Sequence, residues 1–385
     1  MSNHLGKWLT ASAIVLLSAC AATEVAPLDQ VEEIPKDEAR LWERSEAAAD
    51  GIKRALKSGD DELQTYVDEI LDRLISSGTQ LAPERFPTIT LLDSVEGNAS
   101  AMPHGDLFIS YGMLAQLDNE DQLAFILAHE VTHYLNRHSL TANRYATNQK
   151  VKSFLGDLAL AAIGVPPVSG PNEAAWQLAL NSRYSREQET EADLQAVVIM
   201  RYAGYNDREA IGALEKLRVS AGEVRQPLFS THPNVGTRIT AVAELMEVEA
   251  SLIEHSRVDD VYIDRIEHLL MPQAVAMIKN REYRGASTIL GHYLKRNPDD
   301  ADALFAHAET TRLASSSLEA STEAAKSYQK AILLGGAPPA AYRELGMHYR
   351  LVGDHGKART FFMQYLEVAP DAIDAPIIKA YAEQE

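Results

Sequence analysis

The sequence predicts an α+β, mainly helical protein, in which a first domain of helices with a small β-sheet is followed by a helical superhelix. Three observations support this fold. Apolar residues recur at helical spacing, short segments have the composition of β-strands, and the last third contains a repeat. With 385 residues, of which 46% are hydrophobic and 24% charged, the chain is long enough for two or three domains.

The formal net charge of −19 excludes one class of partner. A strongly negative protein repels phosphate groups, so bulk electrostatics would oppose binding to nucleic acid or to anionic lipid. We therefore expect protein partners and no nucleic acid.

Residues 1–20 have the features of a bacterial lipoprotein signal peptide. Lys7 gives a positive start, and Leu9 to Leu17 form an apolar stretch too short to span a bilayer. The segment ends Leu-Ser-Ala-Cys, which resembles a lipobox, so we expect cleavage before Cys20 and a lipid on its thiol. The alternative is an ordinary secretory signal that ends in cysteine. Because Cys20 is the only cysteine, a disulfide within the chain and a cysteine zinc site are excluded.

Residues 21–36 are rich in Ala, Glu and Pro, which predicts a flexible tether between the lipid and the first domain. No Asp lies next to Cys20, since Ala21 and Ala22 follow it. By resemblance to sorted bacterial lipoproteins, this favours the periplasm as the location, with lipid anchoring to the outer membrane through Cys20.

Helical spacing from Leu41 to Ser76, broken at residues 58–60, predicts two helices. Asp118 is expected to cap a third helix that runs to about Arg137. A long fourth helix is predicted from about Asn172 to Tyr202. A packed helix is also predicted over residues 154–165. The buried side of the third helix should comprise Leu123, Ile126, Leu127, Val131 and Tyr134.

Three short strands are predicted between these helices. They are Pro87–Leu92, Asn98–Met102 and Leu107–Ser110, and the turn chemistry of residues 103–106 joins the last two.

The last third of the chain matches a tetratricopeptide repeat of 34 residues that ends at Pro370. An upstream unit keeps Ala324, Tyr328 and Ala331 at the spacing of the second helix, after an apparent insertion, and a third unit that ends at Pro298 is degenerate. Such repeats bury their apolar faces by stacking on neighbours, which predicts a superhelix from about Met271 to Ile378. The matching residues are Tyr342, Leu345, Gly346, Tyr349, Ala358, Phe362 and Tyr365. We place the first domain at residues 37–265 and the repeat domain at 266–385.

Residues 129–133 have the H-E-x-x-H spacing, within the helix predicted from periodicity. At positions i and i+4 the imidazoles of His129 and His133 leave the same helical face and can bind one zinc ion, with Glu130 beside them. Catalytic zinc also needs a third protein ligand and an open position. Glu189 and Asp193 lie four residues apart on the later helix and could supply this third ligand. Without the H-E-x-x-H motif, we would interpret this acidic run as a solvated helix face.

Together these motifs resemble metallopeptidase family forty-eight, which includes membrane prenyl proteases and the periplasmic beta-barrel assembly-enhancing protease. The resemblance implies a zincin-like peptidase domain that binds one Zn2+ per subunit. It implies that His129, His133 and Glu189 are the zinc ligands and that Glu130 is the general base. Asp193 would be the carboxylate that orients a ligand histidine.

The same resemblance implies roles for two further residues, His232 and Arg238. His232, in Thr-His-Pro, would occupy the fourth metal position and hold the enzyme latent, and Arg238 would line the active site. Taken alone, a His before Pro is typical of a loop that ends in a turn. We interpret His104 as a turn residue, and His138, His292 and His348 as surface residues.

The predicted function is therefore that of a periplasmic zinc metalloendopeptidase that cleaves misfolded or misassembled envelope and outer-membrane proteins. An exposed edge strand, near residues 98–103, could hold an extended substrate. The repeats would dock protein substrates or the outer-membrane assembly machinery. One alternative is a chaperone or assembly scaffold for outer-membrane proteins with a latent metal site. Another is a non-catalytic lipoprotein with a structural zinc, in which Glu130 would have no role.

Overall fold

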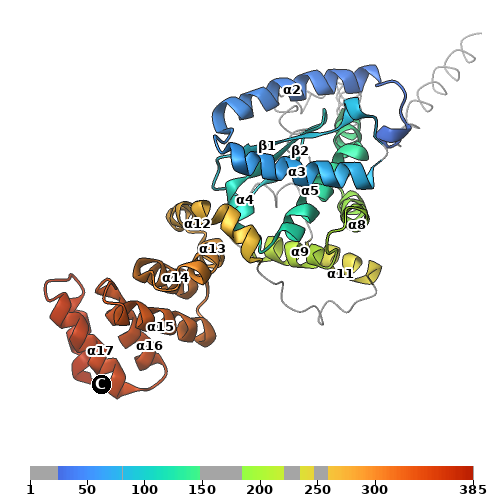
Figure 1. The fold of residues 1–385 in the computed structure, drawn as a ribbon. Coiled ribbons are helices and arrows are strands. Elements are labelled where there is room, and N and C mark those ends of the chain that lie inside the picture. Colours follow the sequence, from blue (N-terminus) through green and yellow to red (C-terminus); the bar gives the residue numbers. More distant parts are fainter. Residues whose placement is uncertain (1–24, 80, 148–183, 221–234, 247–258, 385) are drawn as a thin grey trace, which may run out of the picture.

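The computed structural model describes residues 25–79, 81–147, 184–220, 235–246 and 259–384 (Figure 1). The predicted signal peptide with Cys20, the predicted helix over residues 154–165, and His232 all lie outside the described residues. The described part is mainly helical and has one small sheet. This confirms the predicted α+β, mainly helical fold class.

The first elements of the described chain are a short 3-10 turn and two long helices. The turn η1 (Leu28–Gln30) leads into α2 (Lys36–Leu56), and α3 (Asp61–Gly78) follows. The break between α2 and α3 falls at the predicted Ser-Gly-Asp, because the side chain of Asp60 accepts a hydrogen bond from the backbone N–H of Leu63 and so begins α3.

The sheet has three strands in the order β1-β3-β2 among the described residues. After the 3-10 turn η2 (Pro83–Arg85), β1 (Thr88–Leu92) runs parallel to β3 (Asp106–Ser110), and β2 (Ala99–Ala101) pairs antiparallel with β3. The turn between β2 and β3 needs Gly105, whose φ is +104°. All three predicted strands are present, and β2 lies at the edge of the sheet.

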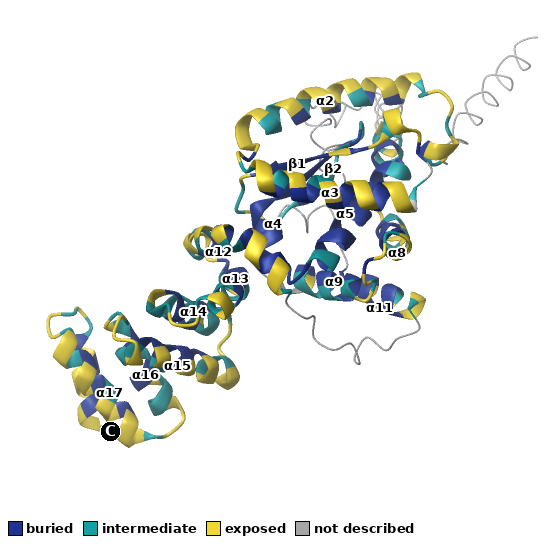
Figure 2. Ribbon diagram, viewed as in Figure 1, coloured by how far each residue is buried: buried dark blue, intermediate teal, exposed yellow. Residues whose placement is uncertain are grey.

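The buried centre of the fold is α5 (Glu120–Leu135), which follows the short helix α4 (Tyr111–Gln116). Every residue of α5 from Gln122 to Tyr134 is buried (Figure 2), including the five predicted apolar ones. The predicted cap, Asp118, is wrong by one residue. The side chain of Asn119 accepts from the N–H of Gln122 instead, and the carboxylate of Asp118 pairs with Lys216 and His292.

The helix that faces α5 is α8 (Arg186–Tyr202), followed by α9 (Glu209–Ser220) and α11 (Val235–Leu245). The predicted start near Asn172 lies outside the described residues, and residues 184–185 are not helical, so the prediction of a helix unbroken to Tyr202 is wrong. Ser185 has extended backbone dihedrals and forms a reciprocal capping box with Gln188, which fixes the start at Arg186. The helix ends as predicted, before Gly204 with a φ of +79°.

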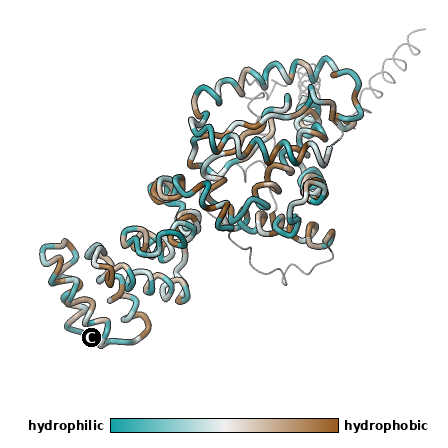
Figure 3. Tube along the Cα trace, in the orientation of Figure 1, coloured by the Kyte–Doolittle hydropathy of each residue, from teal (hydrophilic) through white to brown (hydrophobic). Residues whose placement is uncertain are grey.

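The C-terminal third is a row of helices that extends away from the first part of the molecule (Figure 1). Each helix packs on the one before it. Their apolar residues lie in stripes rather than all round (Figure 3), as expected for helices with one buried face. The row consists of α12 (Asp260–Asn280), α13 (Tyr283–Arg296), α14 (Ala301–Ala314), α15 (Leu318–Leu333), α16 (Ala340–Leu351), α17 (His355–Val368) and α18 (Ala375–Gln384).

The first two helices of this row share the core of the preceding part. Apolar residues of α12 and α13 belong to the same buried cluster as those of α4, α5 and α9. The hydroxyl of Tyr262 donates to the carbonyl oxygen of Leu114 at 2.8 Å. Residue 265, where we expected the first domain to end, therefore lies inside α12.

A membrane-spanning helix would have to be long and apolar, and no helix within the described ranges meets both conditions.

Candidate metal centre

The helix α5 presents the two histidines of the H-E-x-x-H motif on one side. Nε2 of His129 lies 3.0 Å from Nε2 of His133, and both rings are almost completely buried. Glu130 is 2% exposed in the same turn. The four-residue spacing on a straight helix produces this arrangement, because residues i and i+4 lie one above the other.

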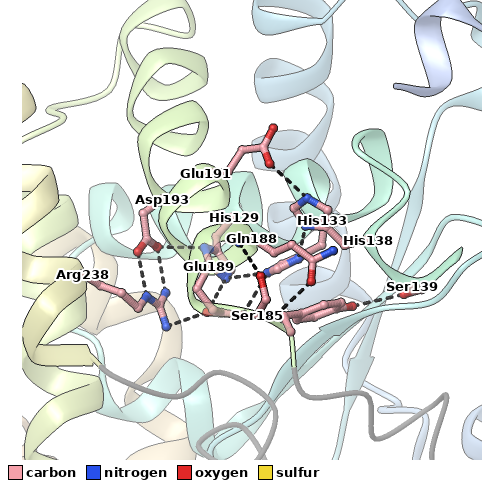
Figure 4. Close-up of polar contacts among 11 residues, drawn as sticks. His129, His133, His138, Ser139, Ser185, Gln188, Glu189, Glu191, Asp193 and Arg238 are labelled. Carbon is pink, nitrogen blue, oxygen red and sulfur yellow. Dashed lines mark hydrogen bonds and ion pairs between the residues drawn. The ribbon is translucent and has the colours of Figure 1, made fainter. Parts of the chain in front are cut away.

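The helix α8 brings a carboxylate to the same point (Figure 4). Oε2 of Glu189 lies 3.7 Å from Nε2 of His129, and Oε1 lies 3.5 Å from Nε2 of His133. All three donor atoms lie within 4.8 Å of one another, and Glu189 is fully buried. The structure therefore joins two helices whose motifs are more than fifty residues apart in the sequence.

These distances can be compared with the requirements of a metal ion. Zinc bound by nitrogen and oxygen ligands at about 2.0–2.1 Å in a tetrahedron places its ligands about 3.3 Å from one another. The separations of 3.0, 3.5 and 3.7 Å, of which the last two are measured to different oxygens of Glu189, lie on both sides of that value. Two imidazoles and one carboxylate are also the ligand types of catalytic zinc sites, so the residues fit this ion.

Asp193, one turn along α8 from Glu189, lies behind the first histidine. Its Oδ1 lies 2.9 Å from Nδ1 of His129, an arrangement that directs Nε2 of His129 toward the donor group. Arg238 of α11 donates to both carboxylate oxygens of Asp193 at 2.7 Å. Burial raises the pKa of Asp193, but the charge and hydrogen bonds of Arg238 outweigh it and bring the pKa to about 2.

Arg238 also lies 2.8 Å from Glu189, measured from its second terminal nitrogen to Oε2. Its guanidinium thus contacts two carboxylates at once, and the residue is 2% exposed. We expected Arg238 to line the active site. Its contacts in the structure are those of a residue that holds Glu189 and Asp193 in place.

The charge of this buried cluster favours a cation. Three carboxyl groups, from Glu130, Glu189 and Asp193, surround one guanidinium, and all are at most 2% exposed. Buried charges are costly unless they are paired, so an excess of carboxylates over cationic side chains is stabilised by a divalent ion.

Sequence reasoning missed two residues around the second histidine. His138, which we expected on the surface, is buried, and its Nδ1 lies 2.8 Å from Nδ1 of His133. Burial, together with the charge of His129, lowers the pKa of His138 to about 4. The ring of Tyr184 stacks on His133 with ring centroids 3.8 Å apart. Both residues lie outside the predicted motifs: His138 begins the helix after the break that follows α5, and Tyr184 directly precedes the cap of α8.

The other histidines are placed as follows. His104 lies in the predicted turn, with Nδ1 2.5 Å from Oγ of Ser45 and Nε2 3.0 Å from Asp106. His292 is buried against Asp118, so the surface prediction for it was wrong. His348 is half-buried and lies 2.9 Å from Oγ of Ser321.

Comparison with known proteins identifies the family of the domain that carries this site. The sequence profile of peptidase family M48 matches residues 61–246, which include every residue of the donor group. Residues 61–246 thus form a peptidase family M48 domain. In M48 terms, α5 carries the H-E-x-x-H motif and α8 the later acidic motif.

Several curated proteins are similar to this chain over part of its length. The mitochondrial metalloendopeptidase OMA1 of Schizosaccharomyces pombe is 30% identical over 182 residues, which cover 46% of this chain and 52% of that protein. The beta-barrel assembly-enhancing protease of Escherichia coli K12 is 26% identical over 185 residues, covering 46% and 37%. Metalloprotease YcaL of the same strain is 26% identical over 152 residues, covering 35% and 53%. The chain thus spans about half or less of the length of these relatives.

Proposed function

We propose that this chain is a zinc-dependent endopeptidase. The observation that carries the proposal is the convergence of His129, His133 and Glu189 on one point, with Glu130 in the same buried turn of α5. A structural zinc alone would leave Glu130 without a role.

The residues divide the chemistry between them. Bound zinc supplies the Lewis acidity that activates water and polarises a peptide carbonyl. Glu130 takes the proton of the attacking water on its carboxylate and then passes it to the departing amine nitrogen. Asp193 holds the ring of His129, and Arg238 pairs with Glu189 and Asp193 and so holds both carboxylates in place.

The edge strand β2 is proposed to bind the substrate. Among the described residues β2 pairs only with β3, so its other side could bind an extended peptide through backbone hydrogen bonds. The chain at the end of β2 is close to the metal centre, since Ala101, Met102 and His133 line the same small cavity. Recognition through the backbone selects unfolded segments more than particular side chains.

The natural substrates are proposed to be misfolded or misassembled envelope proteins in the periplasm. The support is the lipobox-like segment before Cys20, and the name of the bacterial relatives, beta-barrel assembly-enhancing protease. Lipidation at Cys20 would anchor the enzyme to the outer membrane.

The C-terminal helices are proposed to be tetratricopeptide repeats that dock substrates or assembly proteins. The residues that match the repeat pattern support this, since Gly346 of α16 lies directly against the ring of Phe362 of α17. Leu345, Ala358 and Tyr365 are also buried. We propose residues 37–265 and 266–385 as the two functional units, with α12 shared between them.

His232 is proposed to be a removable fourth ligand that keeps the peptidase latent. The support is its Thr-His-Pro context and its position three residues before Val235, the first residue of α11, the helix that carries Arg238. Replacement of His232 by Ala should then accelerate cleavage.

The test is digestion of casein or an unfolded porin by the full chain, with zinc or with a chelator. Glu130→Gln should bind zinc as the wild type does and lose activity by at least about 100-fold. Glu215→Gln, at a half-exposed residue of α9 that pairs with Arg218 and is not part of the donor group, is the control and should cleave normally. Undiminished cleavage by Glu130→Gln would contradict the proposal. Rescue of outer-membrane assembly by that variant would instead support a scaffold.

A further inference from the structure

The second ligand histidine is held differently from the first. His129 has a carboxylate, Asp193, behind it. His133 has a second histidine, since Nδ1 of His138 lies 2.8 Å from Nδ1 of His133 (Figure 4). This nitrogen-to-nitrogen contact is within hydrogen-bond distance, and both residues are buried.

A hydrogen bond between two ring nitrogens needs one proton, which one nitrogen donates and the other accepts. Nε2 of His133 faces Nε2 of His129 and Oε1 of Glu189, so it must be unprotonated to bind a metal ion. The proton of neutral His133 is then on Nδ1, which donates to Nδ1 of His138. His138 in turn carries its own proton on Nε2.

Nε2 of His138 points toward Glu191 of α8, with 3.5 Å between Nε2 and Oε2. The carboxylate of Glu191 is half exposed. Glu191 thus contacts Nε2 of His138, and His138 contacts Nδ1 of His133. This chain of hydrogen bonds, which runs from a carboxylate at the surface to the metal centre, fixes the tautomer of both rings.

We propose that His138 is a positioning residue for the metal ligand His133, accepting its Nδ1–H hydrogen bond and so directing Nε2 of His133 at the metal. The proposal rests on the metal centre proposed above. It assigns a role to a residue outside the H-E-x-x-H motif and outside the acidic motif.

The backbone is built to bring His138 back to His133. The helix α5 ends at Leu135, and a further helix begins at residue 138. Between them Arg137 has a φ of +52°, a left-handed conformation that is unfavourable for a residue with a side chain. Such a conformation persists only where the surroundings enforce it.

The side chain of Arg137 supplies that enforcement. Its Nε donates to Oε1 of Glu38 at 2.8 Å, and a terminal nitrogen donates to the other oxygen of that carboxylate. The second terminal nitrogen donates to the carbonyl oxygen of Ala26 at 2.9 Å. The pair is almost fully buried, so α2 holds the turn that places His138.

Tyr184 restricts the rotation of the His133 ring. The two rings are stacked, with an interplanar angle of 16°, and the hydroxyl of Tyr184 lies 3.2 Å from Oγ of Ser139. Ser139 follows His138 directly, so the same turn supports the hydrogen bond and the stacking contact.

The test is zinc affinity of the full chain, measured by competition with a chromophoric chelator. His138→Phe keeps a ring but removes the acceptor, and we expect its zinc affinity to fall about 10- to 100-fold. His138→Gln retains an acceptor oxygen and should recover most of the affinity. The visible spectrum of the cobalt-substituted protein should shift in His138→Phe and return toward wild type in His138→Gln. His348→Phe, on α16, is the control and should bind zinc like wild type.

His138→Leu serves in place of His138→Phe if circular dichroism shows that the latter does not fold. Zinc affinity of His138→Phe or His138→Leu within about threefold of wild type would overturn this inference alone, since effects of removing such a partner are expected to exceed tenfold. Failure of the wild type to bind zinc would overturn the proposed metal centre, and this inference with it.

Discussion

Nε2 of His292 lies 2.8 Å from Oδ1 of Asp118, although 174 residues separate them in the sequence. His292 belongs to α13, and Asp118 lies two residues before α5, the helix of the H-E-x-x-H motif. Lys216 of α9 reaches the same carboxylate oxygen at 2.7 Å. A helix of the C-terminal row is thus fixed, through a buried polar contact, to the start of the motif helix.

Asp118→Asn should destabilise the protein at neutral pH. Burial raises the pKa of Asp118, but the hydrogen bond from His292 and the charge of Lys216 outweigh it and bring the pKa to about 2. A folded-state pKa below the ordinary 3.8 means that ionised Asp118 stabilises the fold above that pH, by roughly 2 kcal/mol. Urea unfolding of both proteins measures the difference.

The stability gap between wild type and Asp118→Asn should shrink as the pH falls from about 4 toward 2, since Asp118 then becomes neutral in both states. Asp299→Asn is the control, because Asp299 forms an exposed pair with Lys330 and should change stability little. A gap that stays constant down to pH 2 would contradict the argument.

Asp193→Asn should weaken zinc binding by about 10- to 100-fold, because it removes the charged acceptor behind His129 and frees Arg238 from its bidentate partner. Chelator competition measures the effect. The matched control is Asp207→Asn, since Asp207 pairs with Arg201 on the surface, away from the metal centre. Equal zinc affinities of the two variants would exclude the positioning role of Asp193.

Zinc should stabilise the folded protein by mass action. At a free concentration of about 100 times the Kd, the free energy of unfolding should rise by about 2.7 kcal/mol, and a chelator should reverse the gain. Glu130→Gln should show the same gain, because Glu130 is not among the three donors. An equal gain in His133→Ala would show that zinc binds elsewhere.

Gly346→Ala should destabilise the C-terminal helices. An added Cβ would overlap the ring of Phe362, which is fully buried, and overpacking of this kind costs about 1–3 kcal/mol. Gly356→Ala is the control, since its Cβ would meet only Asp354 at 3.9 Å. Hydrogen exchange in α16 and α17 should increase in Gly346→Ala alone. Unchanged hydrogen exchange would contradict the prediction, since it would show that α16 and α17 accommodate the added Cβ without a loss of stability.

Local patterns in the sequence predicted the features that depend on local physics. The break at residues 58–60, the three strands and the buried face of α5 follow from turn residues and from periodicity. The pairing of α5 with α8 was expected only because the two motifs together resemble a known family. Helical periodicity predicts each helix but not which two helices pack together, and here the family resemblance predicted that pairing.

The remaining features depend on contacts between distant segments. Asn119 rather than Asp118 caps α5, because the carboxylate of Asp118 is taken by Lys216 and His292. His138, one residue past the predicted end of the helix at about Arg137, was expected on the surface. It is buried because the left-handed turn at Arg137 is held by a residue of α2.

X-ray absorption at the zinc K-edge tests the metal centre most directly. The full chain loaded with one equivalent of zinc should show a first shell of nitrogen and oxygen at about 2.0–2.1 Å, with scattering from at least two imidazoles. One imidazole should disappear in His133→Ala. A wild-type spectrum without imidazole scattering, or one unchanged by His133→Ala, would contradict the claim that α5 and α8 together hold the ion.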